Sequence, residues 1–181
     1  MSVPRARSSD EAHLFMALHP CGVCGDGSFV PVVREVLEDG VLVTHYTGRC
    51  DTCRALRDFR FRIDREPEGD GPRFGGDEPS EIIDAGQWLR GVDRVLAETP
   101  SNILGVSEEE WRARRYMFAA AAESVGEVLK FIPAGDDAVP PGAFWTASGR
   151  EMRDAVPERF ERDRLEQLRG VCLELAARFA G

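Results

Sequence analysis

The chain has 181 residues, of which 43% are hydrophobic and 30% are charged, and its formal net charge is -9. This length allows one ordinary domain, or a small module joined to a larger one. The acidic balance argues against broad nonspecific binding to nucleic acid, because phosphate contacts come from Lys and Arg, and it disfavours anionic membrane surfaces. It permits a basic protein partner.

The cellular location is expected to be cytoplasmic. Lys130 is the only lysine, which we interpret as the GC-rich coding bias of a bacterial protein. Residues 1–19 do not form a secretory signal, since Asp10 and Glu11 stand where an apolar run should begin. No stretch reaches the apolar length of a membrane span. In a reducing compartment, paired cysteines are more often metal ligands or redox groups than disulfides.

The N-terminal part is predicted to contain one short helix and three strands. Residues 1–8 are expected to be disordered, and Ser8 with Glu11 has the capping-box pattern that begins a helix running to about residue 18. The hairpin signal Asp39-Gly40 joins two Val-rich segments. Strict alternation of apolar and charged residues predicts a third strand. The three predicted strands are 29–37, 41–46 and 58–63.

The remainder, after a Gly-, Pro- and acid-rich stretch, is predicted to be helical. Two long helices are expected to begin with capping boxes, one at Asp84 and one at Ser107. They are predicted to end near residues 99 and 132. A short helix capped by Ser148 follows an aperiodic segment, and Pro157 suits the first turn of the last helix. In that last helix Cys172 lies in an apolar stripe, so it is expected to be a buried small hydrophobe rather than a reactive thiol.

Two Cys-x-x-Cys pairs carry the strongest chemical signal in the sequence. They are Cys21 with Cys24 and Cys50 with Cys53, separated by the predicted hairpin. Four thiolates on two tight turns make a tetrahedral site for Zn²⁺, and four protein ligands leave no open position for a substrate water. We therefore predict one structural zinc ion.

Residues 20–63, with two cysteine turns, a hairpin and a following strand, resemble a zinc ribbon. The second turn departs from the usual pattern because Arg54 stands where glycine is common. The resemblance covers about a quarter of the chain. It implies a fold that serves nucleic-acid binding, protein docking and enzyme scaffolding alike, so it does not determine the function.

Other chemistries for the cysteines are less favoured. A metal-free redox role requires a Cys-x-x-Cys at a helix N-terminus in a βαβ unit, which neither pair has. The Pro-Cys-x-x-Cys at residues 20–24 matches half of a zinc-deaminase signature, but His13 is not followed by the required Glu. His19 and His45 flank the cysteines as potential substitute ligands, although surface positions are expected for both.

Two further groups of residues are candidates for binding a partner. Positive charge is concentrated around the second cysteine turn and the third strand, where Arg54, Arg60 and Arg62 are candidate phosphate or nucleic-acid contacts. The alternative is a solvated face balanced by nearby aspartates. Phe144 and Trp145 are either core residues or a partner contact, with core packing favoured.

We predict an α+β protein, in which a small three-stranded antiparallel zinc ribbon is followed by an all-α helical domain. The expected segments are an N-terminal segment (1–19), the ribbon (20–64), a linker (65–80) and the helical domain (81–181).

The expected function is non-enzymatic protein–protein interaction in the cytoplasm, as an adaptor or as an immunity- or antitoxin-like protein that neutralises a basic partner. The alternative is a nucleic-acid-associated factor that uses the arginine face of the ribbon. An enzyme ranks third because no catalytic constellation is visible.

Overall fold

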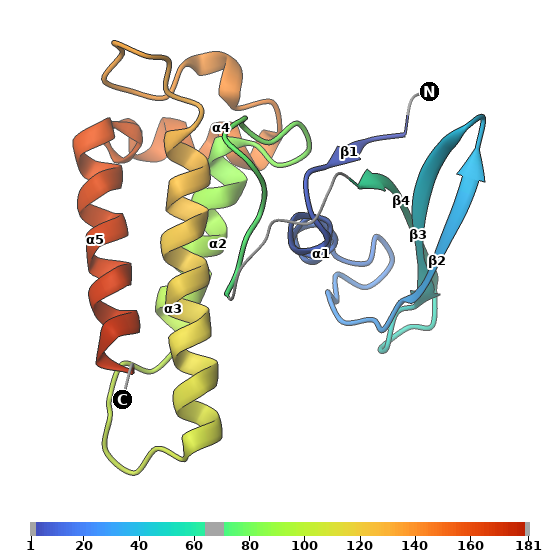
Figure 1. The fold of residues 1–181 in the computed structure, drawn as a ribbon, viewed down its shortest axis with the longest axis horizontal. Coiled ribbons are helices and arrows are strands. Elements are labelled where there is room, and N and C mark those ends of the chain that lie inside the picture. The colour runs from blue at the N-terminus through green and yellow to red at the C-terminus, as the bar shows by residue number, and fades with distance from the viewer. Residues whose placement is uncertain (1–2, 64–70, 180–181) are drawn as a thin grey trace. The chain divides into compact units, whose positions relative to one another are not determined.

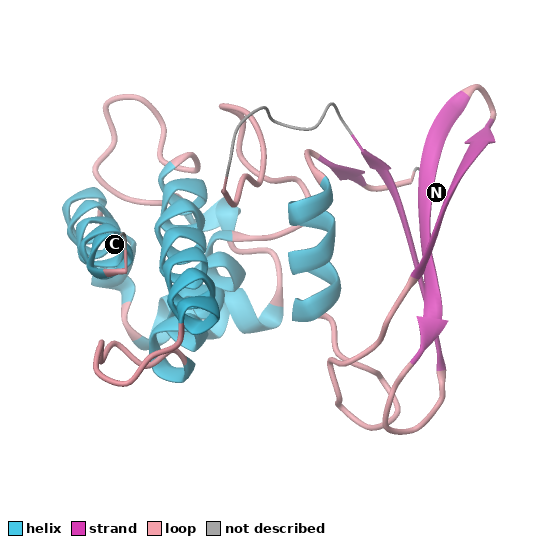
Figure 2. Cartoon of the chain, turned by 60° about the horizontal axis from the view of Figure 1, so that its bottom comes forward, coloured by secondary structure: helices cyan, strands magenta, loops and turns pink. Residues whose placement is uncertain are grey.

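The computed structural model describes residues 3–63 and 71–179, and the chain divides into two compact units. Among the described residues, unit 1 comprises 3–63, 74–76 and 80–82, and unit 2 comprises 71–73, 77–79 and 83–179. Unit 1 contains a sheet with one helix, and unit 2 is helical (Figures 1 and 2). The α+β class is therefore confirmed. Of the predicted linker, residues 65–70 lie outside the described residues.

Unit 1 is a four-stranded mixed sheet in the order β1-β4-β3-β2 (Figure 1). Strands β2, β3 and β4 pair antiparallel, whereas β1 pairs parallel to β4. Helix α1 follows β1 in the chain. The elements are β1 (Arg5–Ala6), α1 (Ser9–Leu18), β2 (Val32–Glu38), β3 (Val41–Arg49) and β4 (Leu56–Ile63).

The prediction of three antiparallel strands is incomplete, and the expected disorder before Ser8 is wrong for the described residues. Residues 5 and 6 pair with residues 62 and 63 of β4, and the Arg62 N–H donates to the Pro4 carbonyl at 2.9 Å. A two-residue parallel strand has no sequence periodicity, so only its distant partner reveals it. The first hairpin strand begins at Val32 rather than Phe29, which forms only an isolated bridge with Cys50.

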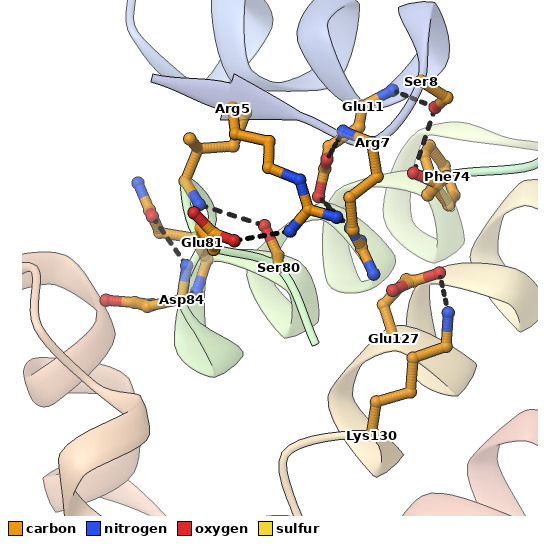
Figure 3. A network of polar contacts seen from close by, with 12 residues as sticks. Arg5, Arg7, Ser8, Glu11, Phe74, Ser80, Glu81, Asp84, Glu127 and Lys130 are labelled. Carbon is orange, nitrogen blue, oxygen red and sulfur yellow. Dashed lines mark hydrogen bonds and ion pairs between the residues drawn. The ribbon is translucent and has the colours of Figure 1, made fainter. Parts of the chain in front are cut away.

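Helix α1 begins with the predicted capping residues (Figure 3). The backbone N–H of Glu11 donates to Ser8 Oγ at 3.1 Å, and Ser8 Oγ donates to the carbonyl of Phe74 at 3.0 Å. The Glu11 carboxylate accepts from the backbone N–H and from the guanidinium of Arg7, both at 2.6 Å. Each partner of this buried ion pair thus has hydrogen bonds that compensate for its removal from water.

One face of the sheet packs against α1 through aromatic rings. Phe15 lies edge-on to Phe61, with 5.4 Å between ring centroids, and His13 contacts Tyr46 at 5.4 Å in the same way. Tyr46 and Phe61 are almost fully buried. They belong to β3 and β4, so α1 covers the inner strands of the sheet. This core is small, which makes a metal crosslink valuable for stability.

Unit 2 is a group of packed helices in which α3 contacts both α2 and α5, and α2 contacts α4 (Figure 1). Phe179, which caps the end of α5, packs between Trp111 and Phe118 of α3 at centroid distances of 5.3 and 5.8 Å. Short 3-10 turns occur at Pro141–Ala143 and Pro157–Phe160. The α-helices are α2 (Ala85–Glu98), α3 (Glu108–Leu129), α4 (Ala147–Ala155) and α5 (Arg162–Arg178).

Both predicted capping boxes of the long helices are confirmed, at Asp84 for α2 and at Ser107 for α3. The start of α4 was predicted two residues too late. Thr146, not Ser148, is its N-cap, and Thr146 Oγ1 accepts from the Gly149 N–H at 2.9 Å. Pro157 opens a 3-10 turn before α5 instead of α5 itself.

Asp84 joins two helix N-termini within unit 2. Its Oδ1 accepts from the backbone N–H of Gln87 at 2.8 Å, which caps α2. Its Oδ2 accepts from the N–H and the hydroxyl of Thr146 at 2.7 and 2.6 Å. The carboxylate is fully buried, and a Cβ at Gly149 would lie only 2.3 Å from it. The close approach of α2 and α4 therefore requires glycine at position 149.

We expect Asp84→Ala to lower the free energy of unfolding of unit 2 by about 2–4 kcal/mol, measured by urea denaturation. The variant loses a helix cap, worth about 1 kcal/mol, and leaves the Thr146 N–H without its acceptor, at about 1–3 kcal/mol more. Ser107→Ala is the matched control, because its capping box is exposed and joins no second helix. It should cost about 1 kcal/mol. Equal losses in the two variants would contradict the role of Asp84 as a junction.

Candidate metal centre

The two Cys-x-x-Cys segments form turns of the same kind. The Gly25 N–H donates to the Cys21 carbonyl at 2.8 Å, and the Arg54 N–H donates to the Cys50 carbonyl at 2.9 Å. Gly25 and Arg54 occupy equivalent positions with φ of 77° and 61°. The second turn thus places an arginine in the left-handed conformation that favours glycine. This explains how the second turn forms despite its departure from the usual knuckle sequence.

The two turns bring four sulfur atoms together. The four Sγ atoms lie within 4.8 Å of one another, and the Sγ atoms of Cys21 and Cys53 are 3.5 Å apart, as are those of Cys24 and Cys50. A tetrahedral ion with metal–sulfur bonds of about 2.3 Å requires sulfur separations of about 3.8 Å. All four cysteines are free. The cluster can therefore hold a metal ion, and zinc fits its donor set and size.

Hydrogen bonds from backbone N–H groups change the pKa values of the cysteine thiols. Those of Val23 and Cys24 lower the pKa of Cys21 to about 6, which favours its thiolate at neutral pH. At Cys24 the N–H of Asp26 also favours the thiolate, but hydrogen bonding with Cys53 and the other neighbouring thiols outweighs it and raises the pKa to about 12. The four thiols compete for the single most favourable thiolate position. The sulfur that loses its proton accepts hydrogen bonds from neighbouring thiols, which therefore stay protonated. A divalent cation removes that competition by replacing the protons.

Residues around the cysteines hold the two turns against each other. Thr52 Oγ1 donates to Asp26 Oδ2, and the Ser28 N–H donates to Asp26 Oδ1 at 3.0 Å. The Thr52 bond, together with that of Ser28, holds the pKa of Asp26 below its usual value. The Asp51 N–H also donates to the Ser28 carbonyl at 3.1 Å. One turn is thus tied to the other by side-chain and backbone hydrogen bonds, independently of the sulfurs.

Arg57, one of the arginines that concentrate positive charge in this part of the sequence, has a structural role that the sequence did not predict. Its guanidinium donates to the carbonyls of Gly27 at 2.8 Å, Met16 at 3.1 Å and His19, so it links the end of α1 to the exit of the first turn. Its guanidinium carbon lies 4.2 Å from the centroid of the Phe29 ring. The alternation of faces along β4 could have indicated this role. Arg57 is four residues before Phe61 and therefore lies on the same face of the strand, which is the face toward the core.

Of the three candidate nucleic-acid contacts, Arg60 and Arg62 lie in β4 and line the same hollow, whereas Arg54 lies in the second cysteine turn. Arg60 forms an ion pair with Glu38, and the same carboxylate accepts from His45 Nε2 at 2.7 Å. Arg62 lies exposed further along β4, and Arg54 lies exposed in the second cysteine turn. Neither flanking histidine joins the sulfur cluster. His19 Nδ1 instead bonds the Phe15 carbonyl at 2.7 Å.

The other singled-out residues lie in unit 2. Phe144 is only 3% exposed and meets Phe160 edge-on at 4.7 Å, so its ring offers no surface to a partner. Trp145 is 41% exposed and lies 6.1 Å from the Phe131 ring. Cys172 is fully buried, as expected of a small apolar core residue, and burial raises the pKa of its thiol to about 11.

Comparison with known proteins finds no matching family model, no matching curated protein and no matching solved structure. Within the described residues, no helix combines the length and apolar character needed to cross a membrane.

We expect the purified chain to carry one metal ion per molecule, measured by native mass spectrometry and elemental analysis. Cys21→Ser and Cys50→Ser should each lose it, because three thiolates bind far more weakly than four. Cys172→Ala is the control and should keep full occupancy. A strong chelator should remove strand signal from the circular dichroism spectrum and leave most helix signal, since α2–α5 lie in unit 2. A metal-free chain that is insensitive to the chelator would contradict the assignment.

We expect Arg54→Gly to stabilise unit 1 by about 1 kcal/mol, because glycine adopts positive φ without the steric cost of a side chain. The measurement is denaturant unfolding followed by the strand signal in the far-ultraviolet circular dichroism spectrum, since the strands belong to unit 1. Arg54→Ala keeps a Cβ and should bring no gain. Gly25→Ala should lose about as much as Arg54→Gly gains, and its Cβ would meet no atom within 4 Å. A stabilising Arg54→Ala would show that charge, not backbone strain, is responsible.

Proposed function

We propose that this protein is a cytoplasmic zinc-ribbon protein that acts without catalysis by binding another polypeptide along strand β2. The observation that carries the proposal is the exposure of this strand. Six of the seven residues of β2 are exposed, although four of the seven are Val or Leu. A strand of this composition is expected to be half-buried, and large exposed apolar patches mark interaction sites.

Zinc is the proposed metal, with Cys21, Cys24, Cys50 and Cys53 as its ligands. An all-thiolate donor set with tetrahedral spacing favours zinc over the harder divalent ions, which prefer oxygen. Four thiolates complete the coordination sphere, so the ion serves the fold and not a reaction. In this proposal it holds the base of the β2–β3 hairpin while the hairpin itself remains open to a partner.

The apolar side chains lie on both faces of the β2–β3 hairpin. The register opposes Val33 to Tyr46 and Leu37 to Leu42 on the face that α1 covers further along the sheet. Val33, Leu37 and Leu42 are 52%, 71% and 53% exposed, so α1 does not reach them. The opposite face carries Val32, Val36 and Val41, which are also 40–56% exposed. Covering these six side chains is worth on the order of 5 kcal/mol.

The outer edge of β2 defines how a partner can bind. β2 is the last strand of the sheet, so the backbone groups on its outer side have no strand partner among the described residues. An extended segment can add there as a fifth strand, gaining main-chain hydrogen bonds and pockets for alternate side chains. A hollow of about 250 Å³ lies over the face of the sheet that α1 partly covers, and it is lined by Ser9, Val33, Glu35, Leu42, Thr44, Tyr46 and Ile63.

The chemistry of that hollow indicates the partner. Its walls are mostly apolar, and Glu35 is the only charged residue among the described residues that line it. Together with the net charge of -9, this favours an extended segment of a basic protein, with an apolar residue for the hollow and Lys or Arg opposite Glu35. Neutralisation of a basic partner, as immunity and antitoxin proteins perform, agrees with this chemistry.

Nucleic acid remains the alternative partner and is less well supported. The ion pair between Arg60 and Glu38 removes one of the three candidate phosphate contacts from a free positive face. The remaining two, Arg54 and Arg62, lie on different segments.

The proposal is tested by photo-crosslinking in the native host. A photoreactive residue replaces Leu37 in a tagged chain, and the control replaces Leu104, which is 85% exposed in unit 2. We expect one discrete protein adduct at position 37 that survives nuclease treatment and is absent at position 104. Adding Val36→Lys should abolish the adduct, whereas Leu173→Lys on α5 should leave it intact. Adducts at both positions, an adduct with a second copy of this chain, or loss on nuclease treatment would overturn the proposal.

A further inference from the structure

A cavity lined by described residues lies in unit 2, whereas the sulfur cluster and β2 belong to unit 1. Its volume is about 580 Å³, within the range of small-molecule sites. One wall is the segment Gly71–Arg73, and the other is a single face of α3. The α3 residues lining it follow helical spacing: Arg112, Arg115, Tyr116, Ala119 and Glu123.

Positive charge outweighs negative charge among the described residues that line this cavity, although the chain as a whole is acidic. These lining residues include three arginines, Arg73, Arg112 and Arg115, and one carboxylate. That carboxylate, on Glu123, faces Arg169 of α5, with 3.6 Å between Oε1 and Nη2. Its charge is therefore already matched from outside the cavity lining. Charges more than about 8 Å away are largely screened at physiological salt, so groups close to the cavity contribute most to the potential here.

Two of these guanidinium groups are available to a ligand. Among the residues that the structure describes, Arg112 forms an ion pair only with Glu108, at 4.0 Å. Both side chains are more than 70% exposed, and such a contact contributes little to stability. Arg115 makes no hydrogen bond or ion pair with any described residue. Both lie on the same side of α3, one turn apart, which is the arrangement that allows two planar forks to grip one phosphate group.

Tyr116 adds a second type of contact. Its side chain is 48% exposed and lines the cavity next to Arg115, while the small side chain of Ala119 leaves room one turn further along α3. An exposed aromatic ring beside guanidinium groups is suited to stacking a planar ring whose phosphate the arginines hold. The cavity thus offers one region for an anion and one for a flat ring.

We propose that this cavity binds a small phosphorylated compound with a planar ring, of the size of a nucleotide. Arg112 and Arg115 hold the phosphate, and Tyr116 stacks on the ring. The site is independent of the β2 surface, because all of its residues belong to unit 2. If the cavity binds no such compound, the proposal that β2 binds a protein partner is not affected.

The test is isothermal titration calorimetry of the full-length protein with ADP, pyrophosphate and adenosine in magnesium-free buffer. We expect ADP to bind with a Kd below about 1 mM, pyrophosphate to bind more weakly and adenosine to show no measurable heat. Arg115→Gln should weaken ADP about tenfold or more, as loss of a charge-assisted hydrogen bond does. Tyr116→Ala should bring ADP down to the affinity of pyrophosphate.

Arg164→Gln is the matched control, since it removes the same charge from the exposed start of α5 outside the cavity lining. It should change the affinity less than twofold. Equal weakening by Arg115→Gln and Arg164→Gln would show only general attraction of anions and would overturn the site. Absence of ADP binding at 1 mM would do so too. Thermal unfolding of each variant verifies that these exposed substitutions leave the fold intact.

Discussion

Unit 1 depends on the convergence of four sulfur atoms from two turns that are separated by a long hairpin. Its aromatic core, where Phe15 meets Phe61, covers only the inner strands. The turns are nevertheless arranged before any ion is considered, because Asp26, Thr52 and Arg57 fix their backbones. A metal that binds such a prepared site adds its binding energy to the stability of the fold. Unit 1 is thus held together by its small aromatic core, by these hydrogen bonds and by the sulfur cluster. Strand β2 contributes almost no side chain to the core.

The sequence was sufficient to predict the elements that neighbouring residues determine. The capping boxes at Asp84 and Ser107 begin their helices where expected, since a capping residue acts on backbone groups three positions away. The two Cys-x-x-Cys turns likewise brought their sulfurs together. The start of α4 was misplaced because two hydroxyl residues compete for one cap, and the buried carboxylate of Asp84 selects Thr146.

Features created by distant residues could not be predicted in this way. Strand β1 exists through pairing with residues 62 and 63, and the α3 cavity exists because the segment 71–73 passes beside one helix face. The exposure of β2 contradicts its composition, which is typical of a strand with one covered face. Such disagreement between local preference and observed environment is expected at functional surfaces, where a protein keeps apolar groups for a partner instead of its own interior.

The shared carboxylate of Asp84 has a consequence for how unit 2 comes apart. Asp84 and Thr146 are 62 positions apart in the chain, and the whole of α3 lies between them. Their hydrogen bonds close this stretch into a loop, and the guanidinium of Arg90 closes it a second time by donating to the Ser148 carbonyl at 3.2 Å. Separating the beginnings of α2 and α4 therefore breaks the cap of α2 and the bonds to Thr146 together, and while these bonds hold, the stretch that contains α3 is closed at both of its ends.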